Sequence, residues 1–159
     1  MLVLGSDLMK FRNYFIAKID EMIRDFTAFG NPVVLGLLIL LFLGLTLKSL
    51  YLIVGLIAID LVCNLIKLFF FRHRPVKKDF SNFLEKIDAG SFPSIHSARS
   101  SFVFISFFFL TSFPVNWIFL LLILVVGLTR ILLKKHYLFD VLAGYAIGLA
   151  VYFVWQILL

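Results

Sequence analysis

The stretch Thr129-Arg130-Ile131-Leu132-Leu133-Lys134-Lys135-His136-Tyr137-Leu138-Phe139-Asp140 joins two long apolar runs and carries four charged residues and a histidine. A connector between membrane helices can be made from a few polar turn residues, so these charges require a further explanation. His136 and Asp140 are four residues apart, so they would share one face of a helix that begins near Lys135, where the carboxylate can hold the imidazole. The alternative is a basic connector at the lipid headgroups, with His136 as an interfacial side chain.

The composition places this stretch in a membrane protein. The 159 residues are 62% hydrophobic and 15% charged, with a mean hydropathy of +1.07, which is too much apolar surface for one soluble core. The net charge of +6 is spread over connectors, which fits headgroup or phosphate contact better than nucleic-acid binding. We expect one membrane domain over residues 1–159, no nucleic-acid partner, and a packing role for the single cysteine, Cys63.

Residues 7–29 have the pattern of an amphipathic helix. Apolar residues recur at steps of three and four from Leu8 to Phe29, and charged residues occupy the other side. The segment holds too many charges to span a bilayer or to form a signal-peptide core, so we expect it to lie in the membrane interface or along the bundle. Gly30-Asn31-Pro32 should end it.

Five apolar runs follow, and each predicts a transmembrane helix: residues 33–47, 50–71, 94–112, 115–128 and 137–159. Lys48 and Ser49 indicate a turn between the first two, because one continuous helix would exceed the roughly 30 Å hydrocarbon core. The expected fold class is therefore all-α, a polytopic membrane helix bundle of about five transmembrane helices plus an N-terminal amphipathic interfacial helix. Gly144 and Gly148 form a GxxxG pair, which indicates close helix packing, within the chain or in a homodimer.

A polar stripe runs along the second expected span. Asp60, Asn64 and Lys67 fall on one helical face, and Arg74 lies about two turns further along it. Ionisable residues inside a membrane are costly, which makes them candidates for function. An interhelical hydrogen bond is the simpler interpretation for Asp60 and Asn64, whereas Lys67 lies near the membrane surface on the same side as Arg74.

The main polar connector covers residues 72–93, and Ser94-Ile95-His96-Ser97 opens the third expected span. A helix N-terminus offers free backbone N–H groups, and together with the Ser94 hydroxyl and the His96 imidazole it makes a potential anion site. The alternative is an ordinary serine N-cap after a proline, with His96 as an interfacial residue.

Because five spans alternate in direction, this connector, the start of the third span and the 129–136 turn emerge on one membrane face. We expect one pocket there, formed by Lys67, Arg74, Ser94, His96, Arg130, His136 and Asp140. Three fixed cations fit a phosphate monoester or diphosphate. A histidine held by an aspartate can attack phosphorus, and a second histidine can protonate the leaving oxygen. No cluster of carboxylates or Cys/His pairs suggests a metal, so we expect neither metal nor cofactor.

At these residues the chain resembles the type 2 phosphatidic acid phosphatase superfamily, integral-membrane lipid phosphatases that share an active site with vanadium haloperoxidases. Lys67, six residues and Arg74-Pro75 resemble the first family motif. Pro93-Ser94-Ile95-His96 resembles the second, usually Pro-Ser-Gly-His. Thr129-Arg130, five residues, His136, three residues and Asp140 resemble the third, which usually begins Ser-Arg.

The resemblance implies a role for each motif residue. His136 would be the nucleophile that forms a phosphohistidine, Asp140 its orienting partner and His96 the general acid. Lys67, Arg74, Ser94 and Arg130 would bind the phosphoryl oxygens without a metal. Ile95 replaces the motif glycine, so either the turn is helical here or the pocket is reshaped. The family core commonly has six spans, and the first would here be reduced to the amphipathic helix.

The expected function is therefore that of a membrane lipid phosphatase working through a phosphohistidine. Candidate substrates are undecaprenyl diphosphate, phosphatidylglycerophosphate, phosphatidic acid and the 1-phosphate of lipid A. Two alternatives are phosphotransfer to another lipid or sugar, and a non-enzymatic transporter that uses Asp60 and Lys67 as an intramembrane charge pair.

The expected location is a bacterial or archaeal cell membrane, with the bilayer and a lipid phosphate as partners. The resemblance favours an active site on the outer face. Positive-inside counting favours the cytoplasmic face, because nine cations fall on the active-site side: Lys10, Arg12, Lys18, Arg24, Lys77, Lys78, Lys86, Lys134 and Lys135. Several of these can serve phosphate or anionic headgroups, Lys134 and Lys135 most simply the headgroups, so we expect the outer face.

Overall fold

The computed structural model describes the backbone of residues 2–158 and the side chains of residues 12–157. Within this part the chain forms seven α-helices, one short 3-10 helix and no strand, which confirms the all-α class. The elements are α1 (Leu2–Thr27), η1 (Ala28–Gly30), α2 (Pro32–Leu43), α3 (Leu47–Phe69), α4 (Phe83–Ala89), α5 (Ile95–Leu110), α6 (Val115–Leu132) and α7 (Leu138–Leu158).

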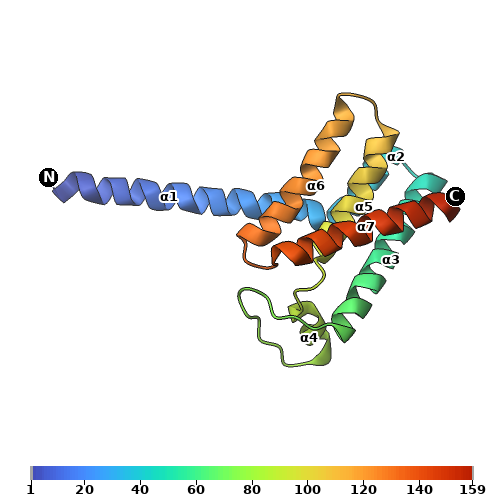
Figure 1. Ribbon diagram of the computed structural model, residues 1–159. Coiled ribbons are helices and arrows are strands. Elements are labelled where there is room, and N and C mark those ends of the chain that lie inside the picture. The colour runs from blue at the N-terminus through green and yellow to red at the C-terminus, as the bar shows by residue number, and fades with distance from the viewer. Residues whose placement is uncertain (1, 159) are drawn as a thin grey trace.

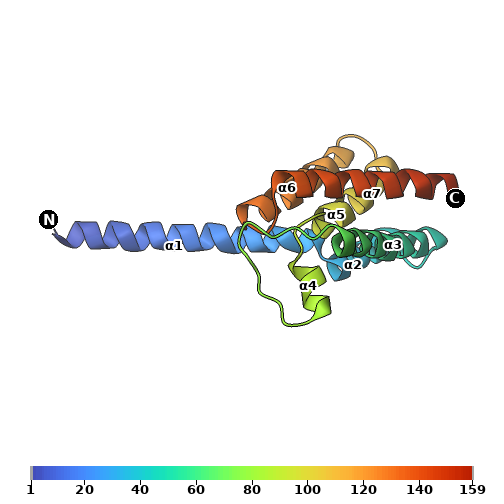
Figure 2. The same cartoon turned by 60° about the horizontal axis from the view of Figure 1, so that its bottom comes forward.

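Helix α1 extends away from the other helices (Figures 1 and 2). The part of its expected amphipathic pattern from Leu8 to Phe11, including Lys10, lies outside the described side chains. Further along, large apolar residues are exposed, with Phe15 at 56% and Met22 at 52%. Thr27 at its C-terminal end donates to Thr129 Oγ1 of α6 at 2.7 Å. An exposed apolar stripe on a charged helix is what a position in the membrane interface requires.

Helices lie at all five positions where spans are expected, but their lengths differ. In the described residues α3, α6 and α7 are long and apolar enough to cross a membrane, and a fourth span results if α1 and α2, bent by 64°, count as one. Helix α2 has 12 residues and α5 has 16, below the roughly 20 that a span needs. The first run is short because Gly44 turns the chain with φ 62 and Thr46 then caps α3. Length and composition thus support three or four complete spans where the sequence predicts five.

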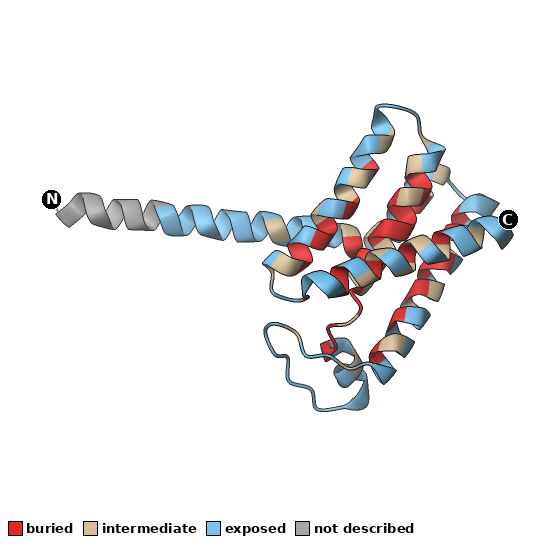
Figure 3. Ribbon diagram, viewed as in Figure 1, coloured by how far each residue is buried: buried red, intermediate tan, exposed pale blue. Residues whose placement is uncertain are grey.

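Helix α5 is the centre of the bundle, and most of its length is buried (Figure 3). Phe102, Phe104 and Phe107 are at most 1% exposed. Helix α7 packs closely on α5 because Gly144 and Gly148 have no side chain: a Cβ at Gly144 would lie 2.4 Å from the Ser94 carbonyl oxygen, and one at Gly148 would lie 2.0 Å from Ser101 Oγ. The GxxxG pair is therefore used for packing inside the chain, and a homodimer stays a prediction.

Replacing Gly144 with alanine is expected to lower stability by about 1–3 kcal/mol, because the added methyl group would overlap main-chain atoms that cannot move aside. Gly36 in α2 is the matched control, since nothing lies within 4 Å of a Cβ there. Gly36→Ala should leave stability unchanged or raise it slightly, because alanine favours a helix. Thermal unfolding in detergent measures both. Equal effects of the two substitutions would contradict this description of the α5–α7 contact.

The fold brings four helix ends together. In Figure 1 the end of α6 lies beside the start of α7, and α4 lies beside the end of α3. Residues from the C-terminal ends of α3 and α6, from the N-terminal end of α5 and from the turn before α7 line one cavity. The turns 44–46 and 111–114 and the end of α7 lie away from this point. All the motif residues thus come from one end of the bundle, as the alternation of helix directions predicts.

Candidate active site

A cavity of about 330 Å³ lies at this end of the bundle. Five of the seven predicted site residues line it, namely Lys67, Arg74, His96, Arg130 and His136. Ser94 and Asp140 do not line it, since both are fully buried. The three motifs therefore converge, although two of their residues lie behind the surface of the cavity.

Main-chain hydrogen bonds tie the three motifs together. The Ser94 N–H donates to the Asp140 carbonyl oxygen at 2.9 Å, and the His136 N–H donates to the Arg130 carbonyl oxygen at 3.2 Å. Ser91 N–H donates to the carbonyl oxygen of Arg72 at 2.7 Å, which fixes the end of the 72–93 connector to its beginning. The cavity is thus framed by bonds that do not depend on side-chain identity.

His136 lies in the turn before α7, which begins at Leu138. Its Nδ1 is 2.7 Å from the Ser91 carbonyl oxygen and 4.0 Å from Asp140 Oδ2. A carbonyl oxygen can only accept, so Nδ1 carries the proton and Nε2 keeps a lone pair. The structure therefore gives the imidazole a main-chain partner where the sequence predicts the carboxylate.

Asp140 acts on His136 through other groups. Its carboxylate accepts from Arg72 Nη1 at 3.0 Å, from the Tyr137 N–H at 2.8 Å and, by a short contact, from Ser91 Oγ. The Arg72 guanidinium also lies 4.3 Å from the centre of the Tyr137 ring. Asp140 thus accepts from the hydroxyl of Ser91, and the carbonyl oxygen of Ser91 accepts from His136 Nδ1, so Asp140 positions the histidine indirectly. Sequence reasoning missed Arg72 and Ser91, which lie 68 and 49 residues from Asp140 and carry no local signal of this contact.

The surroundings keep His136 neutral. Burial lowers the pKa of His136 to about 3, and the nearby cations Arg130 and Lys67 act in the same direction. An imidazole with this pKa is unprotonated near neutral pH and available as a nucleophile. Asp88 brings a negative charge to the same cavity. The hydrogen bond from Lys78 keeps the pKa of Asp88 below its usual range, so this carboxylate is ionised and offsets part of the positive charge of the cavity lining.

Two arginines place unpaired donors in this region. Arg130 is 3% exposed, and its Nε and Nη1 have no hydrogen-bond partner among the described residues. The same holds for Nε of Arg74, whose Nη2 donates to the Asp88 carbonyl oxygen. Lys67 is also 3% exposed. Burying cationic donors without partners costs several kcal/mol, so an anion that supplied the missing acceptors would stabilise this arrangement.

The start of α5 offers further donors. Ser94 precedes the helix, its side chain caps none of the described backbone N–H groups, and its hydroxyl accepts from Ser97 Oγ at 2.9 Å. Ile95 is the first helical residue and lines the cavity. The turn is therefore helical at the position of the motif glycine, and no positive φ is needed there. A helix N-terminus open to a cavity favours negative charge.

The cavity includes residues that the sequence interpretation did not assign to it: Thr27, Lys78, Asp88, Arg99 and Lys135. Lys135 was expected at the headgroups, and the structure places it in the cavity lining, while Lys134 is exposed. Gly30 packs against His96, since a Cβ there would lie 2.7 Å from the His96 Cβ. The N-terminal segment thus closes one side of the site, which the sequence showed only as a helix-breaking Gly-Asn-Pro.

Asp60 has a different partner from the one that a transporter would need. Both of its oxygens accept from Arg99, at 2.5 and 2.7 Å. The charge pair between Asp60 and Lys67 that the transporter alternative requires is therefore not formed, and Asp60 instead joins α3 to α5 through Arg99, as the interhelical hydrogen bond expected for it predicts. In the described part of the chain, no group of three or more His, Cys, Asp or Glu side chains is arranged to hold a metal ion.

The structure is similar to "the first transmembrane PAP2 type phosphatidylglycerolphosphate phosphatase from Bacillus subtilis", with 23% sequence identity, a TM-score of 0.67, and coverage of 88% of this chain and 76% of that one. At this identity the likeness shows a shared fold. Comparison with curated proteins gives no match. The family model of the PAP2 superfamily matches residues 48–158, which include every motif residue from Lys67 to Asp140. The chain therefore belongs to the PAP2 superfamily.

Proposed function

We propose that this protein removes a phosphate from a membrane lipid phosphate or diphosphate through a phosphohistidine formed on His136. The observation that carries the proposal is the pair of unpartnered nitrogens on buried Arg130, in the same cavity as the neutral imidazole of His136. The cations attract a phosphoryl group, and the imidazole can react with it. Membership of the PAP2 superfamily supports the same activity.

The first step forms the covalent intermediate. Nε2 of His136 attacks phosphorus, so a P–N bond forms while the P–O bond to the lipid breaks. The lipid oxygen takes a proton from His96, which lines the same cavity. Burial and the cations Arg130 and Arg99 lower the pKa of His96 to about 2 in the free protein. The negative charge of a bound phosphate acts in the opposite direction, so His96 becomes the acid once the substrate is in place. Lys67, Arg74 and Arg130 stabilise the charge on the phosphoryl oxygens, so no step requires a metal.

The second step releases phosphate. His96, now neutral, takes a proton from a water molecule as the water oxygen attacks phosphorus. The P–N bond breaks, which returns His136 to its neutral form and leaves His96 protonated. The product is inorganic phosphate, and the acids and bases are restored for another cycle.

Turnover of four lipids tests the proposal: undecaprenyl diphosphate, phosphatidylglycerophosphate, phosphatidic acid and lipid A 1-phosphate. The similar structure from Bacillus subtilis is named a phosphatidylglycerolphosphate phosphatase, which supports including phosphatidylglycerophosphate in the test. Release of inorganic phosphate by purified protein from at least one lipid is expected, and EDTA should leave the rate unchanged. Failure with all four, or loss of activity with EDTA that added metal restores, would contradict the proposal.

We also propose that the active site faces the outside of the cell, and cysteine labelling tests this orientation. Leu84 in α4 is 77% exposed near the active-site end, and Leu45 is 94% exposed in the turn at the other end. The native Cys63 is fully buried, so it gives little background. In intact cells an impermeant maleimide should label Leu84→Cys and not Leu45→Cys. The reverse pattern, with both sites labelled after lysis, would place the site in the cytoplasm.

A further inference from the structure

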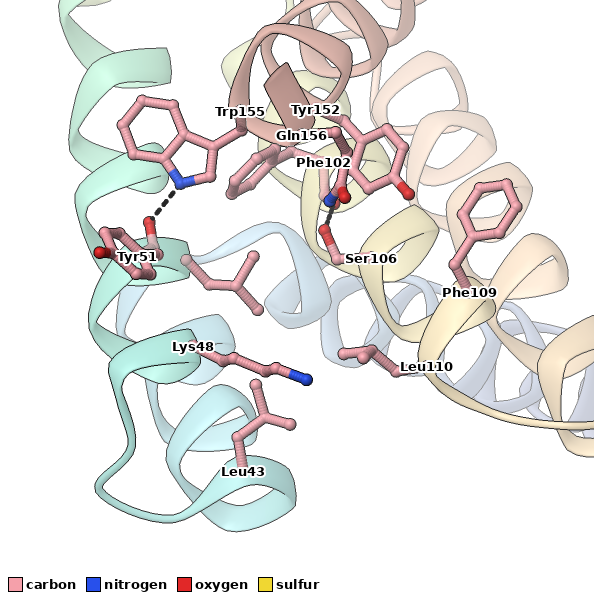
Figure 4. Close-up of a pocket in the computed structure, with 11 residues that line it drawn as sticks. Leu43, Lys48, Tyr51, Phe102, Ser106, Phe109, Leu110, Tyr152, Trp155 and Gln156 are labelled. Carbon is pink, nitrogen blue, oxygen red and sulfur yellow. Dashed lines mark hydrogen bonds between the residues drawn. The ribbon is translucent and has the colours of Figure 1, made fainter. Parts of the chain in front are cut away.

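A second cavity, of about 300 Å³, is lined by residues from the end of the bundle opposite the active site. Figure 4 shows these residues. The cavity is formed between the end of α2, the start of α3, the second half of α5 and the end of α7. Its walls are mostly apolar, with Leu52, Phe102 and Leu110 among them. A cleft of this size is at the lower end of the range for small-molecule sites.

Lys48 brings a single charge to this cavity. In Figure 4 its side chain runs across the opening toward Leu110. Residues 31–58, 103–125 and 146–157, which form this end of the bundle, contain no other charged residue. Lys48 also has no ion-pair partner among the described side chains. Its place in the first turn of α3 is electrostatically unfavourable, because the positive end of the helix dipole lies there.

An aromatic side chain joins two of the helices that line the cavity. The Trp155 indole N–H donates to the Tyr51 carbonyl oxygen at 3.0 Å, which joins α7 to α3 across the cavity wall (Figure 4). Tryptophan and tyrosine are enriched at the headgroup level of membranes. Lys48 lies at the far end of a helix long enough to cross the bilayer. The cavity therefore offers a cation at headgroup depth and an apolar wall beneath it.

We propose that this cavity binds an anionic phospholipid from the leaflet opposite the active site. The lipid phosphate lies at Lys48, and one acyl chain packs against Leu52, Phe102 and Leu110. A phospholipid is the occupant that supplies an anion and an apolar chain at these depths together, and its negative charge offsets both the lysine and the helix dipole. The site is separate from the catalytic cavity, which lies at the other end of α5, and it does not depend on hydrolysis.

Quenching of Trp155 by lipids with brominated acyl chains tests the proposal. Trp117→Phe leaves Trp155 as the single tryptophan, and the protein is reconstituted with brominated phosphatidylglycerol or brominated phosphatidylcholine. Quenching of Trp155 should show that phosphatidylglycerol binds about five-fold more tightly than phosphatidylcholine, the preference that one interfacial lysine provides. Lys48→Met should remove the preference and Lys48→Arg should retain it. Lys134→Met, which removes an exposed cation at the other end, should also retain it.

Three results would overturn the proposal. Equal quenching by the two lipids would show that no anion site exists, and a preference that survives Lys48→Met would place the anion elsewhere. Absence of quenching by either lipid would show that another chain covers the cavity or that lipid does not enter it. Trp155→Phe, which leaves Trp117 as the reporter, controls for general attraction of anionic lipid, and Trp117 should show no preference.

Discussion

Replacing His136 with asparagine should abolish lipid phosphate hydrolysis and the covalent phosphoenzyme together, with kcat falling on the order of 10⁴-fold. The asparagine amide can still donate to the Ser91 carbonyl oxygen, as Nδ1 of His136 does at 2.7 Å. It lacks the nucleophilic Nε2. The substitution therefore removes the reacting atom and keeps the contact that positions it.

Rapid quenching with lipid labelled at the phosphate measures the intermediate directly. The wild-type protein should carry label that is stable in alkali and lost in acid, as a P–N bond requires. His73 is the matched control, because it is an exposed histidine of the 72–93 connector and does not line the cavity. His73→Asn should retain both label and turnover. Label on a folded His136→Asn protein would assign the nucleophile to another residue.

Arg130→Met should have effects of opposite sign on activity and on stability. Loss of its donors should lower kcat/KM by about 10²- to 10³-fold, the usual cost of removing one such group from a transition state. The free protein should become more stable, because Arg130 is buried with two nitrogens unpartnered and methionine occupies the site without that desolvation cost.

Thermal unfolding with and without inorganic phosphate or vanadate separates these effects. The wild-type protein should be stabilised by either anion, whereas Arg130→Met should begin from a higher unfolding temperature and respond less. Lys134→Met is the control, since it removes an exposed cation from the same connector. If Arg130→Met were destabilised and still responded fully to the anions, Arg130 would have a structural role instead of a phosphate-binding one.

Local sequence signals predict most of the fold. Apolar runs and the breakers between them place all five helices of the bundle, because burial in lipid or protein demands long apolar segments. Lengths are less well predicted. Gly44 and Thr46 end one helix and cap the next inside what looks like one apolar region, and α5 can be short because the other helices surround it.

Spacing within each motif predicts which residues lie together, and their roles stay predictions. Lys67, Arg74, His96, Arg130 and His136 gather as expected. The contacts that position them could not be read from the sequence, because each joins residues far apart in the chain: Arg72 with Asp140, Ser91 with His136, and Asp60 with Arg99. An aspartate four residues after a histidine looks like its direct partner, and only the tertiary structure shows a carbonyl group between them.

Under the proposed mechanism, that carbonyl group makes the tautomer of His136 depend on the position of the 72–93 connector. The acceptor for His136 Nδ1 is a main-chain oxygen, so no side-chain substitution at Ser91 can delete it. It is lost only when residues 72–93 leave their place. In a molecule whose 72–93 connector is displaced, His136 would lose this acceptor even if every side chain of the site were intact. Its imidazole could then carry the proton on Nε2 instead of Nδ1. We therefore expect activity only from molecules whose 72–93 connector is in place. Titration of the active site would then measure the correctly folded fraction of a preparation.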